Sequence, residues 1–250
     1  MSIDVSHLVV LGCSFTYGQG LTDPKQEAWA AILANKLNVP IVNLASLGSG
    51  NDRIMRKLFE YHYLDSTDNN PLYIVAFSHS SRREEYIFDE YDYRIVDMHP
   101  DVFPKNDYDF SKSAIANYNQ EIASAKKLMI QSFILDLFKA NNINYFITDF
   151  MPDKDDDLNA IERVYPTAYN KVYNDPYRLM DFGIFSGNYT PLKCGHDGPE
   201  AQQAIANYAY DEAMARFGGI NSVDKSFVSL KEYHDHYAKV GSYLGENAWL

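Results

Sequence analysis

Short apolar runs alternate with longer amphipathic segments through the first third of the chain, and this alternation constrains the fold most. The run Leu8–Leu11 is wholly apolar and stops at Gly12, which is typical of a buried strand that enters a tight turn. The same pattern predicts two more strands and two helices, at Val39–Leu44, Leu72–Phe77, Gln26–Leu37 and Asp52–Tyr63. Short strands that alternate with helices need crossover connections, so the pattern predicts an α/β fold with a mainly parallel sheet.

The alternation continues along the chain, but two stretches interrupt it. A helix, a strand and a further helix are predicted at Ser113–Ala140, Asn144–Phe150 and Pro199–Phe217. Residues 78–112 and 151–190 are rich in Tyr and Asp and have no sustained period, so both are expected to be loop excursions. Since no repeat or linker divides the sequence, we expect a single domain over residues 1–250, with a helical tail at 220–250.

The charge balance limits the partners that the chain can take. With 22 Lys and Arg against 34 Asp and Glu, the formal net charge of the 250 residues is −12. Polyanions repel such a chain, so binding to nucleic acid or to an anionic membrane through bulk charge is not expected. Cys13 and Cys194 are too few for a disulfide framework or a zinc site of spaced cysteines, and a bridge between them stays open.

No targeting segment or membrane span is expected. The N-terminus Met1–Asp4 has no basic region, and Leu8–Leu11 is too short for the apolar core of a signal peptide. No stretch of the sequence approaches the roughly 20 apolar residues of a membrane span. We therefore expect a cytoplasmic or virion-associated protein.

Residues suited to catalysis follow the ends of the predicted strands. In an open parallel sheet, ligands bind beyond the carboxyl ends of the strands. The segments expected at that edge are Gly12–Gly18, Asn43–Asp52, Ser78–Arg82 and, before the final helix, Cys194–Pro199. Together they supply a serine, a loop rich in Gly and Asn, and a histidine, which are the nucleophile, oxyanion donors and general base of a serine hydrolase.

Three blocks in these segments carry a resemblance to a known family. They are Gly-Cys-Ser-Phe-Thr at residues 12–16, the spaced residues Asn43, Gly48, Asn51 and Asp52, and His196 before the last helix. On these blocks the chain resembles the SGNH/GDSL hydrolases, a superfamily of esterases and lipases, and especially its phage and bacterial members. The resemblance covers roughly residues 5–80 and 140–217. It implies a three-layer, flavodoxin-like α/β fold with helices on both faces of the sheet.

The resemblance also implies roles for individual residues. Ser14 corresponds to the nucleophile and His196 to the general base, and the backbone N–H groups of Ser14 and Gly48 correspond to oxyanion-hole donors. The family's third block, Gly-x-Asn-Asp, is replaced here by Ser78–Ser81. The side chain that completes the oxyanion hole is therefore open between two candidates, Asn51 and, by position, Ser80.

A further departure concerns the residue that orients the imidazole. The family has an Asp three residues before the His, and Lys193 stands there in this chain. Loss of such an Asp can cost about 10⁴-fold in kcat where the histidine tautomer depends on it. Another carboxylate or a backbone carbonyl must then orient His196, and the candidate carboxylates are Asp197, Asp181 and Asp149.

These parts predict an ester hydrolase that needs no metal or cofactor. Ser14 attacks an ester carbonyl, His196 carries the proton to the leaving alcohol, and water releases the acyl group. Small acyl esters are the expected substrates, above all O-acetylated carbohydrates, and Arg82 is a candidate substrate contact. Nine of the 20 tyrosines lie in the two excursions, where they suit either a sugar-binding wall or an interface with a second copy of the chain.

Two other functions stay open. A catalytically impaired module that binds glycans, or a phage structural protein, would also explain the departures from the family blocks. An acyltransferase would use the same serine and histidine with a sugar hydroxyl as the acceptor.

Three charged clusters are expected to be solvated, with Arg82 alone kept as a candidate substrate contact. The run Asp153–Asp157 lacks the spacing of a calcium loop, and His234 and His236 point to different faces of a helix. The stretch Arg82–Glu85 is expected to begin an exposed helix or loop.

Overall fold

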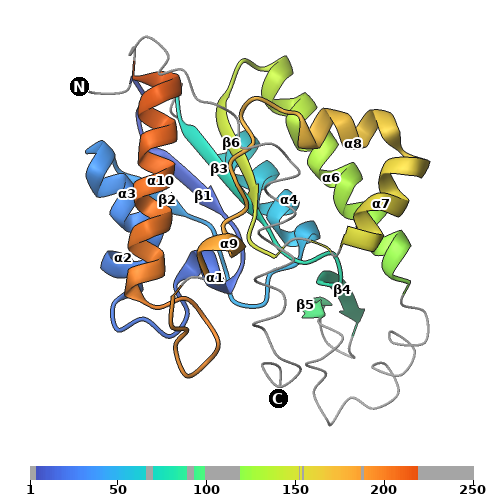
Figure 1. Cartoon of the computed structure of the whole chain (residues 1–250), viewed down its shortest axis with the longest axis horizontal. Coiled ribbons are helices and arrows are strands. Elements are labelled where there is room, and N and C mark those ends of the chain that lie inside the picture. The colour runs from blue at the N-terminus through green and yellow to red at the C-terminus, as the bar shows by residue number, and fades with distance from the viewer. Residues whose placement is uncertain are drawn as a thin grey trace.

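A four-stranded parallel sheet forms the centre of the fold (Figure 1). The computed structural model describes residues 4–65, 70–88, 93–98, 119–151, 153, 155–186 and 189–218. The strands lie in the order β2 (Ile41–Asn43), β1 (Leu8–Leu11), β3 (Leu72–Phe77) and β6 (Asn144–Asp149). All three pairs are parallel, with Leu8 opposite Leu72 and Leu72 opposite Asn144. The predicted parallel sheet is confirmed, and each strand lies at its predicted position.

The helices agree with the sequence pattern at most positions. Their bounds are α1 Ser14–Tyr17, α2 Pro24–Glu27, α3 Trp29–Leu37, α4 Asn51–Glu60, α6 Gln120–Ala140, α7 Asp155–Val164, α8 Pro166–Tyr173, α9 Gly183–Ser186 and α10 Pro199–Phe217, and a π-helical turn over Tyr61–Asp65 follows α4. The predicted helix Gln26–Leu37 is divided at Ala28, whose ψ of 143° is extended. The N–H of Trp29 donates to the side chain of Gln202 on α10, 2.7 Å away, and so links the start of α3 to that helix.

The helices cover both faces of the sheet. Successive residues of a strand point to opposite sides, so a wholly apolar strand needs a cover on each face. Leu8 and Val10 pack in a core with α3 and α10, and Val9 and Leu11 pack in a second core with α4 and α6. Figure 1 shows these two pairs of helices on opposite sides of the strands. Since all four residues of β1 are fully buried, its wholly apolar sequence is explained. The predicted three-layer α/β fold is confirmed.

Both predicted excursions contain regular structure. β4 (Arg83–Phe88) and β5 (Tyr93–Met98) form an antiparallel hairpin, so the expectation of an exposed helix or loop at Arg82–Glu85 is wrong beyond its first residue. Aromatic and β-branched residues in both segments favour strand over helix. In the second excursion, α7 and α8 pack against α6 and against each other.

Several predictions fall on residues outside the described part of the chain. They concern residues 113–118, the remainder of the first excursion, and the whole tail from residue 219, with His234 and His236. The predicted start of the long helix at Ser113 is wrong, because Asn119 is extended and caps a helix that begins at Gln120. Among the helices that the structure describes, none is long and apolar enough to cross a membrane.

Candidate active site

Ser14 lies at the carboxyl end of β1, where the chain turns directly into α1. Cys13 is the extended residue before the helix, and Ser14 is the first helical residue. The turn requires glycine at position 12, because a Cβ there would lie 2.2 Å from Oγ1 of Thr16. Thr16 is fully buried and Ser14 is 3% exposed. The tight turn from strand to helix therefore fixes the position of the Ser14 hydroxyl.

His196 meets Ser14 at this edge although 182 positions separate them in the sequence, and Nε2 of His196 lies 2.8 Å from Oγ of Ser14. Nδ1 lies 3.2 Å from the backbone oxygen of Cys194. The tautomer with hydrogen on Nδ1 donates to that carbonyl and leaves Nε2 to accept the Ser14 hydroxyl proton. The ring of Phe15 lies beside the imidazole, with centroids 4.6 Å apart. The structure thus brings together the residues predicted as nucleophile and base.

A tight turn before α10 carries His196. The N–H of Leu192 donates to the carbonyl of His196, and the N–H of Gly195 donates to the carbonyl of Leu192, each at a distance of 2.8 Å. Gly195 has a φ of 78°, in the left-handed region that favours glycine. α10 then begins at Pro199, whose fixed φ suits the first position of a helix. The turn and the start of the helix hold the imidazole at Ser14.

The partner of Nδ1 is the carbonyl of Cys194, and none of the three predicted carboxylates is hydrogen-bonded to the imidazole among the described residues. Asp149 and Asp181 both bind the guanidinium of Arg178, at 2.5 and 2.9 Å. Asp197 follows His196 directly and is buried. The sequence analysis allowed a backbone carbonyl as an alternative to a carboxylate. It could not identify the carbonyl of Cys194, because the spacing of residues does not show the direction in which a backbone group points.

The surroundings of His196 favour its neutral form. Burial lowers the pKa of His196 below the usual value, the hydrogen bond to the Cys194 carbonyl acts in the opposite direction, and the positive charge of Arg82 lowers the pKa further. Neutral imidazole is the form that accepts a proton. His196 is therefore available as a base at neutral pH and somewhat below it.

The two cysteines near the site are not bonded to each other. Cys13 is buried and Cys194 is exposed, and both are free thiols. Cys194 acts on the site through its backbone, whose oxygen holds Nδ1 of His196.

The predicted oxyanion donors differ in how available they are. As the first residue of a helix, Ser14 has a backbone N–H with no partner inside that helix. Gly48 is exposed and lies in the loop after β2, with a φ of 73°. The buried side chain of Asn51 donates from Nδ2 to the carbonyl of Ser78 at 3.1 Å, and its Oδ1 accepts the N–H of Ser78 at 2.9 Å. Asn51 thus ties the start of α4 to the end of β3, and its oxyanion role stays a prediction.

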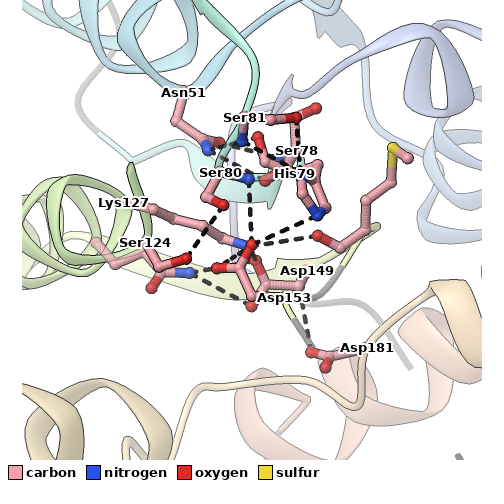
Figure 2. A network of polar contacts seen from close by, with 12 residues as sticks. Asn51, Ser78, His79, Ser80, Ser81, Ser124, Lys127, Asp149, Asp153 and Asp181 are labelled. Carbon is pink, nitrogen blue, oxygen red and sulfur yellow. Dashed lines mark hydrogen bonds and ion pairs between the residues drawn. The ribbon is translucent and has the colours of Figure 1, made fainter. Parts of the chain in front are cut away.

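Ser80, the positional alternative to Asn51, is bonded to α6 (Figure 2). Its Oγ accepts hydrogen bonds from Nε2 of Gln120 at 2.9 Å and from Oγ of Ser124 at 3.2 Å. The Ser80 hydroxyl therefore fixes the loop after β3 to the neighbouring helix.

Arg82 lies two residues after Ser80 in the same loop. It is half-buried and lines a pocket together with Asn51 and the start of α6.

A buried network of charges holds the loops that follow β3 and β6, as Figure 2 shows. Nζ of Lys127 on α6 lies 2.8 Å from Asp149 and 3.6 Å from Asp153, and all three side chains are at most 2% exposed. Asp153 also accepts the N–H of Ser80 at 3.3 Å. The expectation that the run from Asp153 is solvated is therefore wrong for its first residue. Lys127 precedes the buried Ile130 and Ile134 at helical spacing, which was the signal available in the sequence.

Three comparisons relate the chain to known proteins. The model of a family described as "Family of unknown function (DUF6071)" matches residues 18–174, a range that includes neither Ser14 nor His196. No curated protein matches the chain. Solved structures do match it, and their likeness is one of fold.

One similar structure is the psychrotrophic esterase EstA from Pseudoalteromonas sp., inhibited by monoethylphosphonate, with a TM-score of 0.51 and 11% identity over 82% of this chain and 95% of that chain. A family two carbohydrate esterase from Clostridium thermocellum, in complex with cellohexaose, has a TM-score of 0.51 and 14% identity over 88% of this chain and 66% of that chain. TesA has a TM-score of 0.51 and 13% identity over 83% of this chain and 97% of that chain. The chain therefore shares its α/β fold with these three proteins.

Proposed function

The chain belongs to DUF6071, a family of unknown function, and we propose that it is a serine ester hydrolase that acts on small acyl esters. The observation that carries this proposal is the contact of 2.8 Å between Oγ of Ser14 and Nε2 of His196. It lies at the carboxyl edge of a parallel sheet, where open α/β folds bind their ligands. The second ring nitrogen is held by a carbonyl, so the imidazole keeps the tautomer that a general base needs.

The reaction that we propose has two steps. As Nε2 of His196 takes the hydroxyl proton, Oγ of Ser14 bonds to the acyl carbon, and the carbonyl oxygen becomes an oxyanion that the N–H groups of Ser14 and Gly48 would stabilise. The bond to the alcohol then breaks, and the imidazolium returns its proton to the leaving oxygen. Water attacks the acyl-enzyme in the same way and releases the acid.

Within this class, we propose O-acetylated carbohydrates as substrates. The fold shared with a carbohydrate esterase supports this assignment. The tyrosines of the second excursion support it only in part, because Tyr169, Tyr173 and Tyr177 pack against the core beside α6. Tyr165 and Tyr189 are the exposed ones, at 47% and 37%.

Two alternatives have specific support. A carbonyl in the place of the orienting carboxylate, together with an Asn51 side chain bonded to Ser78, would also suit an impaired module that binds glycans without cleaving them. An acyltransferase would pass the acyl group from Ser14 to a sugar hydroxyl instead of water. Acetate release, acetyl transfer to an added sugar, and binding without either product distinguish the three functions.

We expect a fluorophosphonate to form a covalent adduct on Ser14. A serine whose hydroxyl is bonded to a neutral imidazole is an activated nucleophile, and it attacks phosphorus as it attacks an acyl carbon. Intact mass and peptide mapping after labelling measure the adduct, and Ser14→Ala is the control that should not be labelled. An adduct on a different serine that abolishes ester hydrolysis, or hydrolysis that continues after Ser14 is completely labelled, would contradict the proposed function.

The rate should depend on pH through His196. Protonated imidazole cannot take the Ser14 proton, so kcat/KM should fall as pH decreases through the pKa of His196. Because burial and the charge of Arg82 lower that pKa, the midpoint of the fall should lie below the ordinary histidine value of about 6.5. A profile of kcat/KM between about pH 4.5 and 8 measures the midpoint. A midpoint clearly above the ordinary value would mean that another group controls the rate.

A further inference from the structure

Arg82 carries buried hydrogen-bond donors that the fold does not use. Its Nε and Nη1 atoms are inaccessible to solvent and have no hydrogen-bond partner among the described residues. Lys127 and Arg178, the other buried cations described above, are bonded to carboxylates, although Nη1 of Arg178 also has no hydrogen-bond partner among the described residues. Buried N–H groups without an acceptor are costly, and they are rare in folded proteins unless a ligand supplies the acceptor.

The position of Arg82 connects these donors to Ser14. β1 and β3 are adjacent and parallel, so the loops that follow them leave the same edge of the sheet. Ser14 is in the first of these loops and Arg82 in the second. The charge of Arg82 also acts on His196, whose Nε2 is bonded to Oγ of Ser14. The order of the strands therefore places Arg82 and Ser14 in neighbouring loops at the same edge of the sheet.

The loop that carries Arg82 is held firmly at several points. The N–H of Arg82 donates to the carbonyl of His79 at 3.1 Å, and Nδ1 of His79 lies 2.7 Å from Oγ of Ser81. The N–H of Ser80 is bonded to the buried Asp153 (Figure 2). These bonds fix the backbone of the loop, so the movement that would bring the buried donors to a bound ester is left to the Arg82 side chain.

We propose that Arg82 donates a hydrogen bond to the oxyanion, in the place that the sequence predicts for Asn51 or Ser80, whose side chains are bonded to other groups. This inference rests on the proposed ester hydrolase function. When the bond from Ser14 Oγ to the acyl carbon forms, the carbonyl electron pair moves to oxygen, which then bears one negative charge. Arg82 keeps its proton and pairs with that charge, and the pair returns to the carbonyl when the alcohol leaves. The donor is thus a full cation instead of a neutral amide.

A second use of the same guanidinium would be to bind a carboxylate or phosphate on the substrate, and the two uses predict different kinetics. A donor to the oxyanion acts on every ester and lowers the barrier, so its loss appears in kcat. A contact to an anionic substituent acts only on esters that carry one, so its loss appears mainly in KM for those esters. The test therefore compares neutral 4-nitrophenyl acetate with anionic mono-4-nitrophenyl succinate.

We expect Arg82→Gln to lower kcat by about 10²- to 10³-fold for both esters, with KM changed by less than about threefold. Arg82→Lys keeps the charge and one donor direction, so it should recover part of kcat. Lys126→Gln is the matched control. Lys126 lines the same pocket, but it is exposed and paired with Asp52 at 2.9 Å, so its kcat should stay within about twofold of the wild type.

Two further readouts separate a catalytic role from a structural one. Removal of the positive charge should move the acid limb of kcat/KM to higher pH in Arg82→Gln, whereas Arg82→Lys should keep the wild-type midpoint. A fluorophosphonate should still label Ser14 in both variants. If Arg82→Gln does not fold, Arg82→Lys still decides the role: its kcat for both esters should lie below the wild-type value, while KM and the pH midpoint stay unchanged.

A wild-type kcat for the neutral ester in Arg82→Gln, or a loss confined to KM for the succinate ester, would overturn the oxyanion role while the ester hydrolase function stands. A wild-type protein that neither hydrolyses the esters nor reacts with the phosphonate would overturn the proposed function, and this inference with it.

Discussion

Replacement of Ser14 by alanine is expected to lower kcat for 4-nitrophenyl acetate by about 10⁴- to 10⁶-fold, the range seen when an attacking serine is removed. Oγ of Ser14 is the atom that would bond to the acyl carbon, and Nε2 of His196 lies 2.8 Å away to take its proton. Alanine supplies no atom for either step. Release of 4-nitrophenolate at saturating ester, corrected for the uncatalysed reaction, measures the loss.

Ser49 is a matched control for this substitution. It follows Gly48 in the loop after β2, it is 1% exposed, and its Oγ has no hydrogen-bond partner in the described part of the chain. Ser49→Ala therefore removes a buried hydroxyl near the same sheet edge without breaking a hydrogen bond, and kcat should stay within about twofold.

The histidine completes the same test. His196→Ala should lose about as much as Ser14→Ala, and the double variant should lose little more, because two residues that act as a unit are not additive. A wild-type rate of ester hydrolysis in Ser14→Ala would show that Ser14 is not the nucleophile.

The parts of the fold that the sequence predicts well depend on local signals. Leu8–Leu11 is apolar because both of its faces are covered, and such a run identifies a central strand without knowledge of its neighbours. α10 has a proline at its start and a glycine after its end, and both of its bounds match the prediction. The hairpin of β4 and β5 was missed, because neither of its segments has the apolar runs of the central strands.

The sequence predicts the parts of the site that consist of characteristic side chains, but not those that depend on backbone direction or on distant contacts. Ser14 and His196 were identified from their blocks, and the structure brings them into contact. The carbonyl that orients His196 could not be chosen, because its direction depends on the turn at Gly195. The contact between Ser80 and Asp153 joins positions 73 residues apart, and such a pairing leaves no signal in local spacing.

Replacement of Asp149 by alanine is expected to lower the free energy of unfolding by about 3–5 kcal/mol, the cost of removing one partner from a buried ion pair. Asp149 is 1% exposed, and its carboxylate lies 2.8 Å from Nζ of Lys127 and 2.5 Å from Nη2 of Arg178. After the substitution, Lys127 keeps the more distant Asp153 as a partner, and Arg178 keeps Asp181. Urea unfolding followed by circular dichroism measures the change.

The stabilisation should also depend on pH. Burial acts to raise the pKa of Asp149, but the charges of Lys127 and Arg178 outweigh it and hold the pKa below the ordinary value. The contribution of Asp149 is then present above the unfolded-state pKa of about 4 and is lost as pH falls through the lower folded-state pKa. The difference in unfolding free energy between the wild type and Asp149→Ala should therefore be largest near neutral pH and shrink below about pH 4.

An exposed ion pair provides the control for burial. Asp136 is 65% exposed and lies 2.5 Å from Nζ of Lys171, so Asp136→Ala should cost less than about 1 kcal/mol. Adding Lys127→Met to Asp149→Ala removes one of the two stranded cations, so the double variant should be more stable than Asp149→Ala alone. If Asp149→Ala costs no more than Asp136→Ala, the network does not hold the loop after β3. The hydrogen bonds of Ser80 and Asn51 would then have to fix that loop, and with it the position of Arg82.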